Sequence, residues 1–201
     1  MKKNKKGILL VSFVVVTLLF LSGCQNMKMW FKDFEQSFKG LEMTVRTYDD
    51  ESQMIDQISG KSVFIQRDET FDSAEDQADS AVLRIGVGNR ELHHVGSSMV
   101  VAETGLTNVF DEFSAKNDLQ NLDRSVPIVN RMVSDFKNAF SGKKKVILIR
   151  SQRGYPLATY AGDKVSLYKT DVPKSTGILI DGKYLFIYRC DYTIYDREIL
   201  E

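Results

Sequence analysis

Two adjacent imidazoles and one distant thiol are the side chains of this sequence with the most obvious potential for chemistry. Neutral imidazoles bind transition metals, and an imidazole beside a thiol can activate it as a nucleophile. His93 and His94 lie in a predicted strand, where neighbouring side chains point to opposite faces, so they cannot chelate one metal together. Cys190 also lies in a predicted strand and has no nucleophile motif around it. The sequence therefore predicts no catalytic residue, no metal site and no cofactor.

Carboxylates are concentrated in one polar segment, residues 68–80. They are Asp68, Glu69, Asp72, Glu75, Asp76 and Asp79. A calcium loop between two helices needs oxygen ligands at alternate positions, a central glycine and a closing glutamate. This segment lacks the glycine and the alternation, so we expect a solvated loop, with weak cation binding as the alternative.

Cys24 is the one residue for which the sequence predicts a specific covalent modification. Four lysines precede the apolar stretch Ile8–Leu21, and Leu21-Ser22-Gly23-Cys24 follows. The apolar stretch is shorter than the roughly 20 residues of a spanning helix, so we interpret residues 1–23 as a cleaved signal peptide, with an uncleaved anchor as the alternative. The Leu-Ser-Gly-Cys ending resembles the lipobox of bacterial lipoproteins, which implies diacylglyceryl transfer to the Cys24 sulfur and cleavage before it. Two or more acyl chains would then hold the protein at a membrane.

The charge balance restricts the partners. The 201 residues contain 27 basic and 27 acidic side chains, and loss of the signal peptide would leave a small acidic excess. This balance argues against nucleic acid as a partner and against broad adhesion to anionic lipid. With Cys24 acylated, Cys190 would be the only thiol, so no internal disulfide is expected.

Two helices are predicted. Met27, Trp30, Phe31, Phe34 and Phe38 share one helical face, which either packs on the folded domain or lies on the bilayer. The second helix is predicted over Ser125–Ser141, with Pro127 in its first turn and Gly142 at its end. Its apolar stripe should be buried on a sheet. A further helical turn or two is predicted within Leu106–Phe113.

Short apolar segments separated by turn residues predict antiparallel β structure. The predicted strands are Leu41–Tyr48, Gln53–Ile58, Ser62–Arg67, Ala81–Val87, Glu91–Val95, Ser98–Glu103, Lys145–Arg150, Tyr155–Tyr160, Lys164–Lys169, Thr176–Ile180, Lys183–Arg189 and Tyr192–Asp196. Asp181-Gly182 indicates a type I′ hairpin, and Gly88-Asn89 is expected to play the same part earlier in the chain.

The two β regions resemble each other. Residues 44–68 align with 146–170 at an offset of 102 residues, so that Gly60 falls on Gly162. Residues 88–103 align with 181–196 at an offset of 93, so that Arg90 falls on Lys183 and Glu103 on Asp196. We interpret this pattern as an ancestral duplication; the alternative is two unrelated β segments with similar turn spacing.

Several short motifs resemble a family of uncharacterised small lipoproteins of low-GC Gram-positive bacteria, a domain of unknown function. They are Leu21-Ser22-Gly23-Cys24, Trp30 with Lys32, Lys39-Gly40-Leu41, Val45, Tyr48-Asp49, His94-Val95-Gly96-Ser97, Ala102-Glu103-Thr104-Gly105-Leu106, Ser151-Gln152-Arg153-Gly154-Tyr155-Pro156 and Asp181-Gly182-Lys183. The resemblance implies a lipid anchor at Cys24 and a cell-surface location, and it brings no known activity. Asp50-Glu51-Ser52 stands where the family pattern has a glycine.

The expected fold is mainly β (α+β), with two related antiparallel halves of five to six short strands joined by an amphipathic helix. The expected segments are a signal peptide (1–23), the lipidated cysteine with a short helix (24–40), a first β half (41–105), a helical connector (106–144) and a second β half (145–201). We expect a lipid-anchored, non-catalytic binding or structural protein at the outer face of the cytoplasmic membrane. An envelope polymer or a membrane protein is the expected partner. The alternatives are a small-molecule-binding lipoprotein serving a transporter, and an envelope enzyme whose cleft gives His93 or Cys190 a perturbed pKa.

Overall fold

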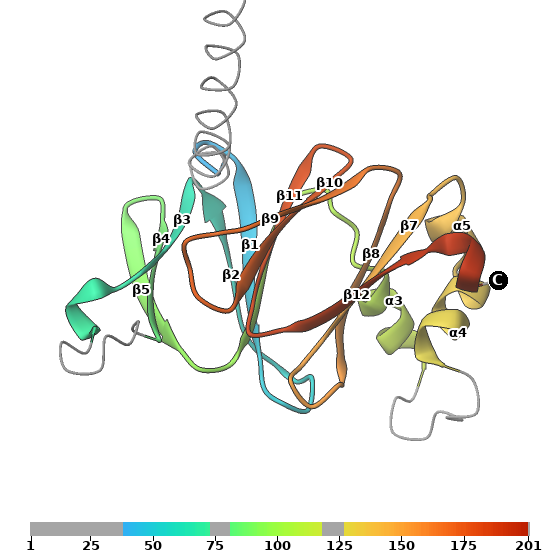
Figure 1. The fold of residues 1–201 in the computed structure, drawn as a ribbon, viewed down its shortest axis with the longest axis horizontal. Helices are drawn as coiled ribbons and strands as arrows, with labels where there is room; N and C mark the ends of the chain where they lie inside the picture. The colour runs from blue at the N-terminus through green and yellow to red at the C-terminus, as the bar shows by residue number, and fades with distance from the viewer. Residues whose placement is uncertain (1–37, 73–80, 118–126, 201) are drawn as a thin grey trace, which may run out of the picture.

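The computed structural model describes residues 38–72, 81–117 and 127–200. These residues form twelve strands in three antiparallel sheets, together with a few short helices (Figure 1), so the predicted mainly β class is confirmed. None of the helices in this part of the chain is long and apolar enough to cross a membrane. Cys24 and the predicted helix over residues 27–38, except Phe38, lie outside the described residues.

Every predicted strand is present, with its ends within a few residues of the expected positions. The first six are β1 (Glu42–Tyr48), β2 (Met54–Lys61), β3 (Val63–Arg67), β4 (Val82–Val87), β5 (Arg90–Val95) and β6 (Ser98–Glu103). The last six are β7 (Lys145–Arg150), β8 (Pro156–Gly162), β9 (Val165–Tyr168), β10 (Ser175–Ile180), β11 (Lys183–Tyr188) and β12 (Asp191–Asp196). Two 3-10 turns, η1 (Glu69–Phe71) and η2 (Arg197–Leu200), follow β3 and β12.

A six-stranded sheet with the order β2-β1-β6-β11-β10-β9 lies between two three-stranded sheets, β3-β4-β5 and β12-β7-β8. Alternation along β6 divides its side chains between two cores. Met99 and Val101 belong to the core shared with β3 and β4. Val100, between them, belongs to the core shared with β7 and β8. β6, in the middle of this sheet, is therefore buried on both faces.

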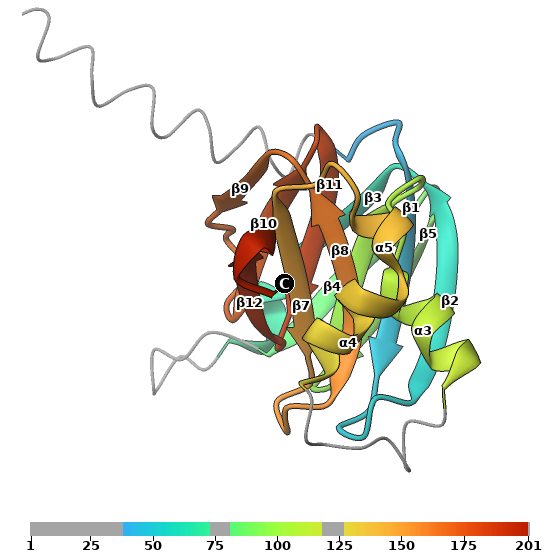
Figure 2. The same cartoon turned by 90° about the vertical axis from the view of Figure 1, so that its right-hand side faces the viewer.

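Ser125, the predicted start of the helix over Ser125–Ser141, lies outside the described residues. From residue 127 on, the helix is present as two pieces, which corrects the expectation of one continuous helix. They are α4 (Ile128–Asp135) and α5 (Lys137–Phe140), separated at Phe136, whose φ of −116° and ψ of 43° leave the helical region. The Phe136 ring packs at 6.1 Å from the ring of Phe113 in α3 (Val109–Lys116), while Phe140 is fully buried. Figure 2 shows α3, α4 and α5 over β7 and β8, where the apolar stripe is buried with Val146 and Leu148.

The first six strands and the last six pair in the same order. β1 pairs with β2 and β6, and β7 pairs with β8 and β12; β4 pairs with β3 and β5, and β10 pairs with β9 and β11. The registers also agree at the two sequence offsets. Val45 lies opposite Ile58 and Ile147 opposite Tyr160, and both pairs of strands have an irregularity at the same place. We use the word counterpart for a residue at the matching position in the other six strands. For residues 40–67 the counterpart lies 102 residues later, and for residues 82–107 it lies 93 residues later.

The turns at matching places have similar backbone conformations. Gly40 and its counterpart Gly142 have φ of +84° and +70°. Asp181 and Gly182 both have positive φ, which confirms the type I′ turn. In the earlier hairpin only Gly88 has a positive φ, so this turn follows the II′ pattern instead of the expected I′ pattern.

Candidate functional site: an open groove between two strands

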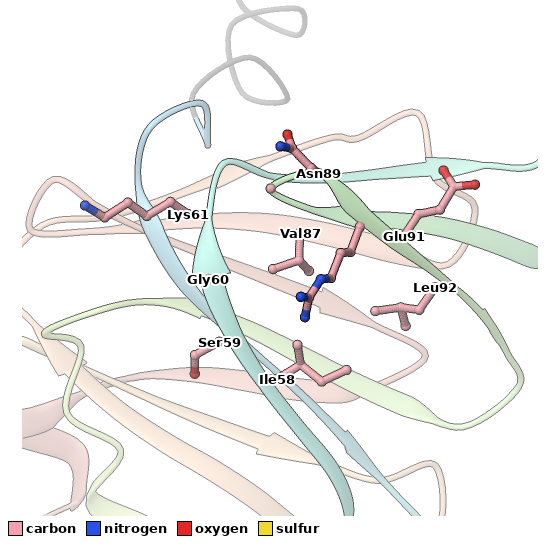
Figure 3. A pocket seen from close by; sticks show the side chains of 10 residues that line it. Ile58, Ser59, Gly60, Lys61, Val87, Asn89, Glu91 and Leu92 are labelled. Atoms are coloured by element: carbon pink, nitrogen blue, oxygen red, sulfur yellow. The ribbon is translucent and has the colours of Figure 1, made fainter.

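A groove of about 500 Å³ lies between β2 and the β4–β5 hairpin (Figure 3). Ile58, Val87 and Leu92 point into it, whereas Lys61 and Glu91 point outward at its rim. The floor is therefore apolar and the rim is charged. This combination is typical of a binding surface.

The close approach of β2 to β4 at one end of the groove depends on a residue without a side chain. A Cβ atom on Gly60 would lie 2.4 Å from Cγ1 of Val87. The Gly88 N–H donates to the Lys61 carbonyl at 3.0 Å and fastens the hairpin to the end of β2. Beyond this point the two strands diverge, and the groove lies between them.

β2 is an edge strand with an unusual exposure of apolar side chains. Met54, Ile55 and Ile58 are 53%, 56% and 37% exposed. The Ser62 N–H donates to the Leu41 carbonyl directly opposite, so by alternation the main-chain groups of Gln57 and Ser59 point away from β1. These groups are available to pair with another strand.

The region at the matching positions of the last six strands is filled. Tyr160, Ile180 and Leu185 are the counterparts of Ile58, Val87 and Leu92, and they are 3%, 1% and 0% exposed. Val100 from β6 packs in the same cluster, with Ala102 and Leu106 against it. The groove is thus the open version of a position that is covered elsewhere in the molecule.

The rim charges of the groove also differ from their counterparts. Among the residues that the structure describes, Lys61, Arg90 and Glu91 form no ion pair or side-chain hydrogen bond. Lys183, the counterpart of Arg90, donates to the Thr104 carbonyl at 2.9 Å and lies 3.6 Å from Glu103.

The two histidines have separate partners. His93 Nε2 lies 3.3 Å from an Asp68 carboxylate oxygen, and half of its side-chain surface is exposed. His94 Nε2 lies 3.0 Å from the Ser97 carbonyl, and its ring meets the Tyr188 ring edge-on. The two imidazoles thus engage separate groups.

Cys190 is held by main-chain carbonyls. Its sulfur lies 3.2 Å from the Tyr188 carbonyl and 3.6 Å from the Met99 carbonyl, and these contacts do not include His93. Burial raises the pKa of the Cys190 thiol to about 12. The thiol is therefore protonated at neutral pH, the form that is not nucleophilic.

The described part of the acidic segment is engaged in local contacts. Asp68 caps η1, and hydrogen bonds from Thr70 lower the pKa of its carboxyl group. Asp72 pairs with Arg67 at 3.3 Å. No cluster of three or more metal-ligating side chains is present within residues 38–72, 81–117 and 127–200. Glu75, Asp76 and Asp79 lie outside those ranges.

The groove was not predicted from the sequence, although the aligned segments differ in polarity at the positions that line it. Glu91, His93 and His94 of β5 have Tyr184, Phe186 and Ile187 as counterparts in β11. Of two counterpart strands, one polar and the other apolar, only the apolar strand is expected to be covered.

Comparison with known proteins gives a family without an activity. A family model described as a domain of unknown function (DUF5052) matches residues 5–200. No curated protein and no solved structure matches the chain.

Proposed function

Since the chain belongs to the DUF5052 family, which has no assigned activity, we propose that it is a non-catalytic binding protein whose groove takes an extended segment of a protein partner. We place it at the outer face of the cytoplasmic membrane, held by a lipid on Cys24. The observation that carries the proposal is the open groove between β2 and the β4–β5 hairpin, with its apolar floor and with rim charges that have no ion pair among the described residues.

Main-chain groups along β2 support a peptide segment as the ligand. An extended peptide can add to an exposed sheet edge, where main-chain hydrogen bonds give affinity and side-chain pockets give specificity. Native proteins usually protect long apolar edges by charge, proline or a covering loop. β2 instead presents Met54, Ile55 and Ile58 beside the groove. A partner that covers this edge would account for their exposure.

The lipid anchor rests on the N-terminal sequence. Lysines, an apolar stretch and Leu21-Ser22-Gly23-Cys24 have the order expected of an exported lipoprotein. The motifs resemble lipoproteins of low-GC Gram-positive bacteria, and we propose that range for the chain. An anchored domain would meet its partner at the membrane surface.

We propose in addition that the domain consists of two related halves. The support is the common pairing order, the common registers and the matching close approaches of Gly60 to Val87 and of Gly162 to Ile180, where an added Cβ would lie at 2.4 and 2.5 Å. Unrelated β segments would not be expected to share each of these details.

The non-catalytic part of the proposal is supported by the surroundings of the thiol and imidazoles. Cys190 is partly buried and its thiol is protonated at neutral pH, and His93 contacts a carboxylate that already caps a helical turn. A nucleophilic mechanism needs a base within hydrogen-bond reach of the group that it activates. The contacts of His93 and Cys190 do not provide this arrangement.

The test is site-specific photo-crosslinking in cells that express the full chain. A photoreactive amino acid at Ile58 or Leu92 should yield a protein adduct at the membrane. The matched control is the same amino acid at Leu167, which is 51% exposed on another edge strand. Equal adducts at all three positions, or none at Ile58 and Leu92, would contradict the groove as a protein-binding site.

A small-molecule-binding lipoprotein serving a transporter is the second candidate, because a volume of about 500 Å³ lies in the range of ligand pockets. This reading predicts that a low-molecular-weight compound copurifies with the full chain. Native mass spectrometry of wild type and of Leu92→Glu would reveal it. Bound mass present in wild type and absent in the variant would favour this candidate over the peptide.

A further inference from the structure

β6 and β11 pair with each other, whereas their counterparts β12 and β5 do not. β11 adds antiparallel to β6, with Tyr188 opposite Met99 and Phe186 opposite Val101. At the end of this ladder the Tyr184 N–H donates to Glu103 Oε2 at 2.9 Å, and Lys183 binds Glu103 and the Thr104 carbonyl. Leu106, just beyond, is partly buried against the apolar cluster that contains Leu185.

Among the described strands, the counterparts of both strands at this junction are edge strands. β5 is the counterpart of β11 and ends the sheet β3-β4-β5; β12 is the counterpart of β6 and ends the sheet β12-β7-β8. Figure 1 shows β5 at the left of the molecule and β12 running toward the right. One chain therefore cannot pair its own β5 with its own β12.

Two exposed apolar side chains mark these edges. Val95 on β5 is 61% exposed, whereas its counterpart Tyr188 is 3% exposed in the junction. Ile199, beyond β12, is 69% exposed, whereas its counterpart Leu106 packs into the junction. Val95 and Ile199 thus occupy positions whose counterparts, Tyr188 and Leu106, pack against apolar side chains at the β6–β11 junction.

The charges at the two edges are complementary in the same way. Arg90 is the counterpart of Lys183, and Asp196 is the counterpart of Glu103. Arg90 has no side-chain partner within the described ranges. Asp196 pairs with Lys145, and 63% of its side-chain surface stays exposed. With the register of the internal junction, Val95 would lie opposite Tyr192 and His93 opposite Ile194, and Arg90 would reach Asp196.

We infer that the occupant of the groove is a second copy of this chain, whose β12 adds to β5 and whose residues Arg197–Leu200 place Ile199 over Leu92. This inference rests on the proposed function and names its partner. The contact is heterologous, since it joins two different edges, so each copy keeps one edge open for the next. Copies anchored on one membrane would form head-to-tail rows or rings.

One pair in this arrangement is unfavourable. Glu91 would lie opposite Asp196, and like charges directly opposite each other weaken a strand pair. Glu91→Gln should therefore strengthen the association. If β5 were only a solvated surface, Glu91→Gln would not be expected to increase self-association.

Charge reversal in a mixing experiment tests the contact. The full chain in a non-ionic detergent, studied by sedimentation velocity, should form concentration-dependent oligomers. Arg90→Glu alone should weaken association at least about tenfold, because it faces Asp196 with a like charge. Asp196→Arg alone should weaken association less, because the new side chain repels Arg90 but attracts Glu91 opposite it. An equimolar mixture of the two variants should restore it. Lys137→Glu, a reversal on an exposed residue of α5, is the control and should have no effect.

Cysteine pairing gives the register. One variant carries Val95→Cys and the other Tyr192→Cys, and both carry Cys190→Ser. Cys24 is retained in all samples. The Cys190→Ser protein without an added cysteine therefore shows any disulfide that forms through Cys24. The mixture should form an intermolecular disulfide, whereas Met54→Cys, 53% exposed on β2, should form none with Tyr192→Cys. Monomers at all concentrations, or equal crosslinking from Met54→Cys, would overturn the inference. In that case, groove-specific photoadducts to another protein would contradict this inference and leave the proposed function intact. Absence of self-association and of groove-specific photoadducts would contradict the inference and the proposed function together.

Discussion

Gly60 and Val87 lie so close that a single added methyl group would not fit between them. The Cβ position of Gly60 is 2.4 Å from Cγ1 of Val87. This contact sets where β2 stops following β4 and therefore where the groove begins. Gly162 and Ile180, the counterparts of Gly60 and Val87, approach each other in the same way. A Cβ atom on Gly162 would lie 2.5 Å from Cγ2 of Ile180.

Gly60→Ala is expected to destabilise the domain by about 1–3 kcal/mol, because the valine and the strand must shift to admit the methyl group. Val87→Ala removes the obstructing atom, so the double variant should recover part of the loss in a double-mutant cycle. Urea unfolding at equilibrium gives these free energies. Additive effects of the two substitutions would show that the close approach is not the cause.

Cys190 should react slowly in the folded protein. Burial raises the pKa of its thiol to about 12, so very little thiolate exists at pH 8. In a Cys24→Ala variant, where Cys190 is the sole thiol, we expect disulfide-reagent labelling at least about a hundredfold slower in buffer than in concentrated urea. Comparable rates in the two solutions would mean that Cys190 is accessible and ionised.

Asp181 should make stability depend on acid pH. The hydrogen bond from Lys143, followed by that from the Lys164 N–H, lowers the pKa of its carboxyl group in the folded state. The associated stabilisation is present above the unfolded-state pKa of about 4 and is lost as pH falls through the folded-state value. Asp181→Asn should therefore cost about 1–2 kcal/mol at neutral pH and progressively less below pH 4.

Asparagine retains the left-handed backbone that Asp181 adopts, with φ of 50°, so this substitution isolates the charge. Asp163→Asn is a suitable control, because the carboxyl group of Asp163 receives none of the described hydrogen bonds. Free energies of unfolding measured from pH 3 to pH 8 should separate the two variants. A constant difference between Asp181→Asn and wild type over that range would contradict the assignment.

Lipid attachment should require the Cys24 sulfur, because only a thiol at that position can accept the diacylglyceryl group. Cys24→Ala should leave an uncleaved precursor without label after growth with a radioactive fatty acid. Cys190→Ala, which removes the other thiol, should retain the label. Labelled Cys24→Ala protein would refute the lipoprotein interpretation.

The local pattern was sufficient to predict the strands. Ser98–Glu103 and Lys145–Arg150 were predicted with the bounds that they have in the structure. The end of β2 was predicted at Ile58, but the strand continues to Lys61. Ser59-Gly60 reads as a turn locally, yet both residues pair with β1, where Gly60 lies opposite Met43. Pairing between strands is not visible in a short window of sequence.

The break in the predicted helix has the same origin. Val129, Met132, Phe136 and Phe140 follow a single stripe in the sequence, but Phe136 packs against Phe113 of another helix. The groove was also inaccessible to local reasoning, since it depends on β11 pairing with β6 while β5 stays at an edge. In the sequence, the groove is indicated only by the difference in polarity between counterpart residues of β5 and β11, such as His93 and Phe186.

The asymmetric pairing of β6 with β11 has a consequence for the origin of the domain. A gene duplication within a two-fold symmetric dimer would join both pairs of equivalent edges, so that β5 would meet β12 as β11 meets β6. Here only one pair is joined. If the halves descend from one ancestor, their single junction is of the kind that joins successive subunits end to end, and fusion would have captured two such subunits with one link between them.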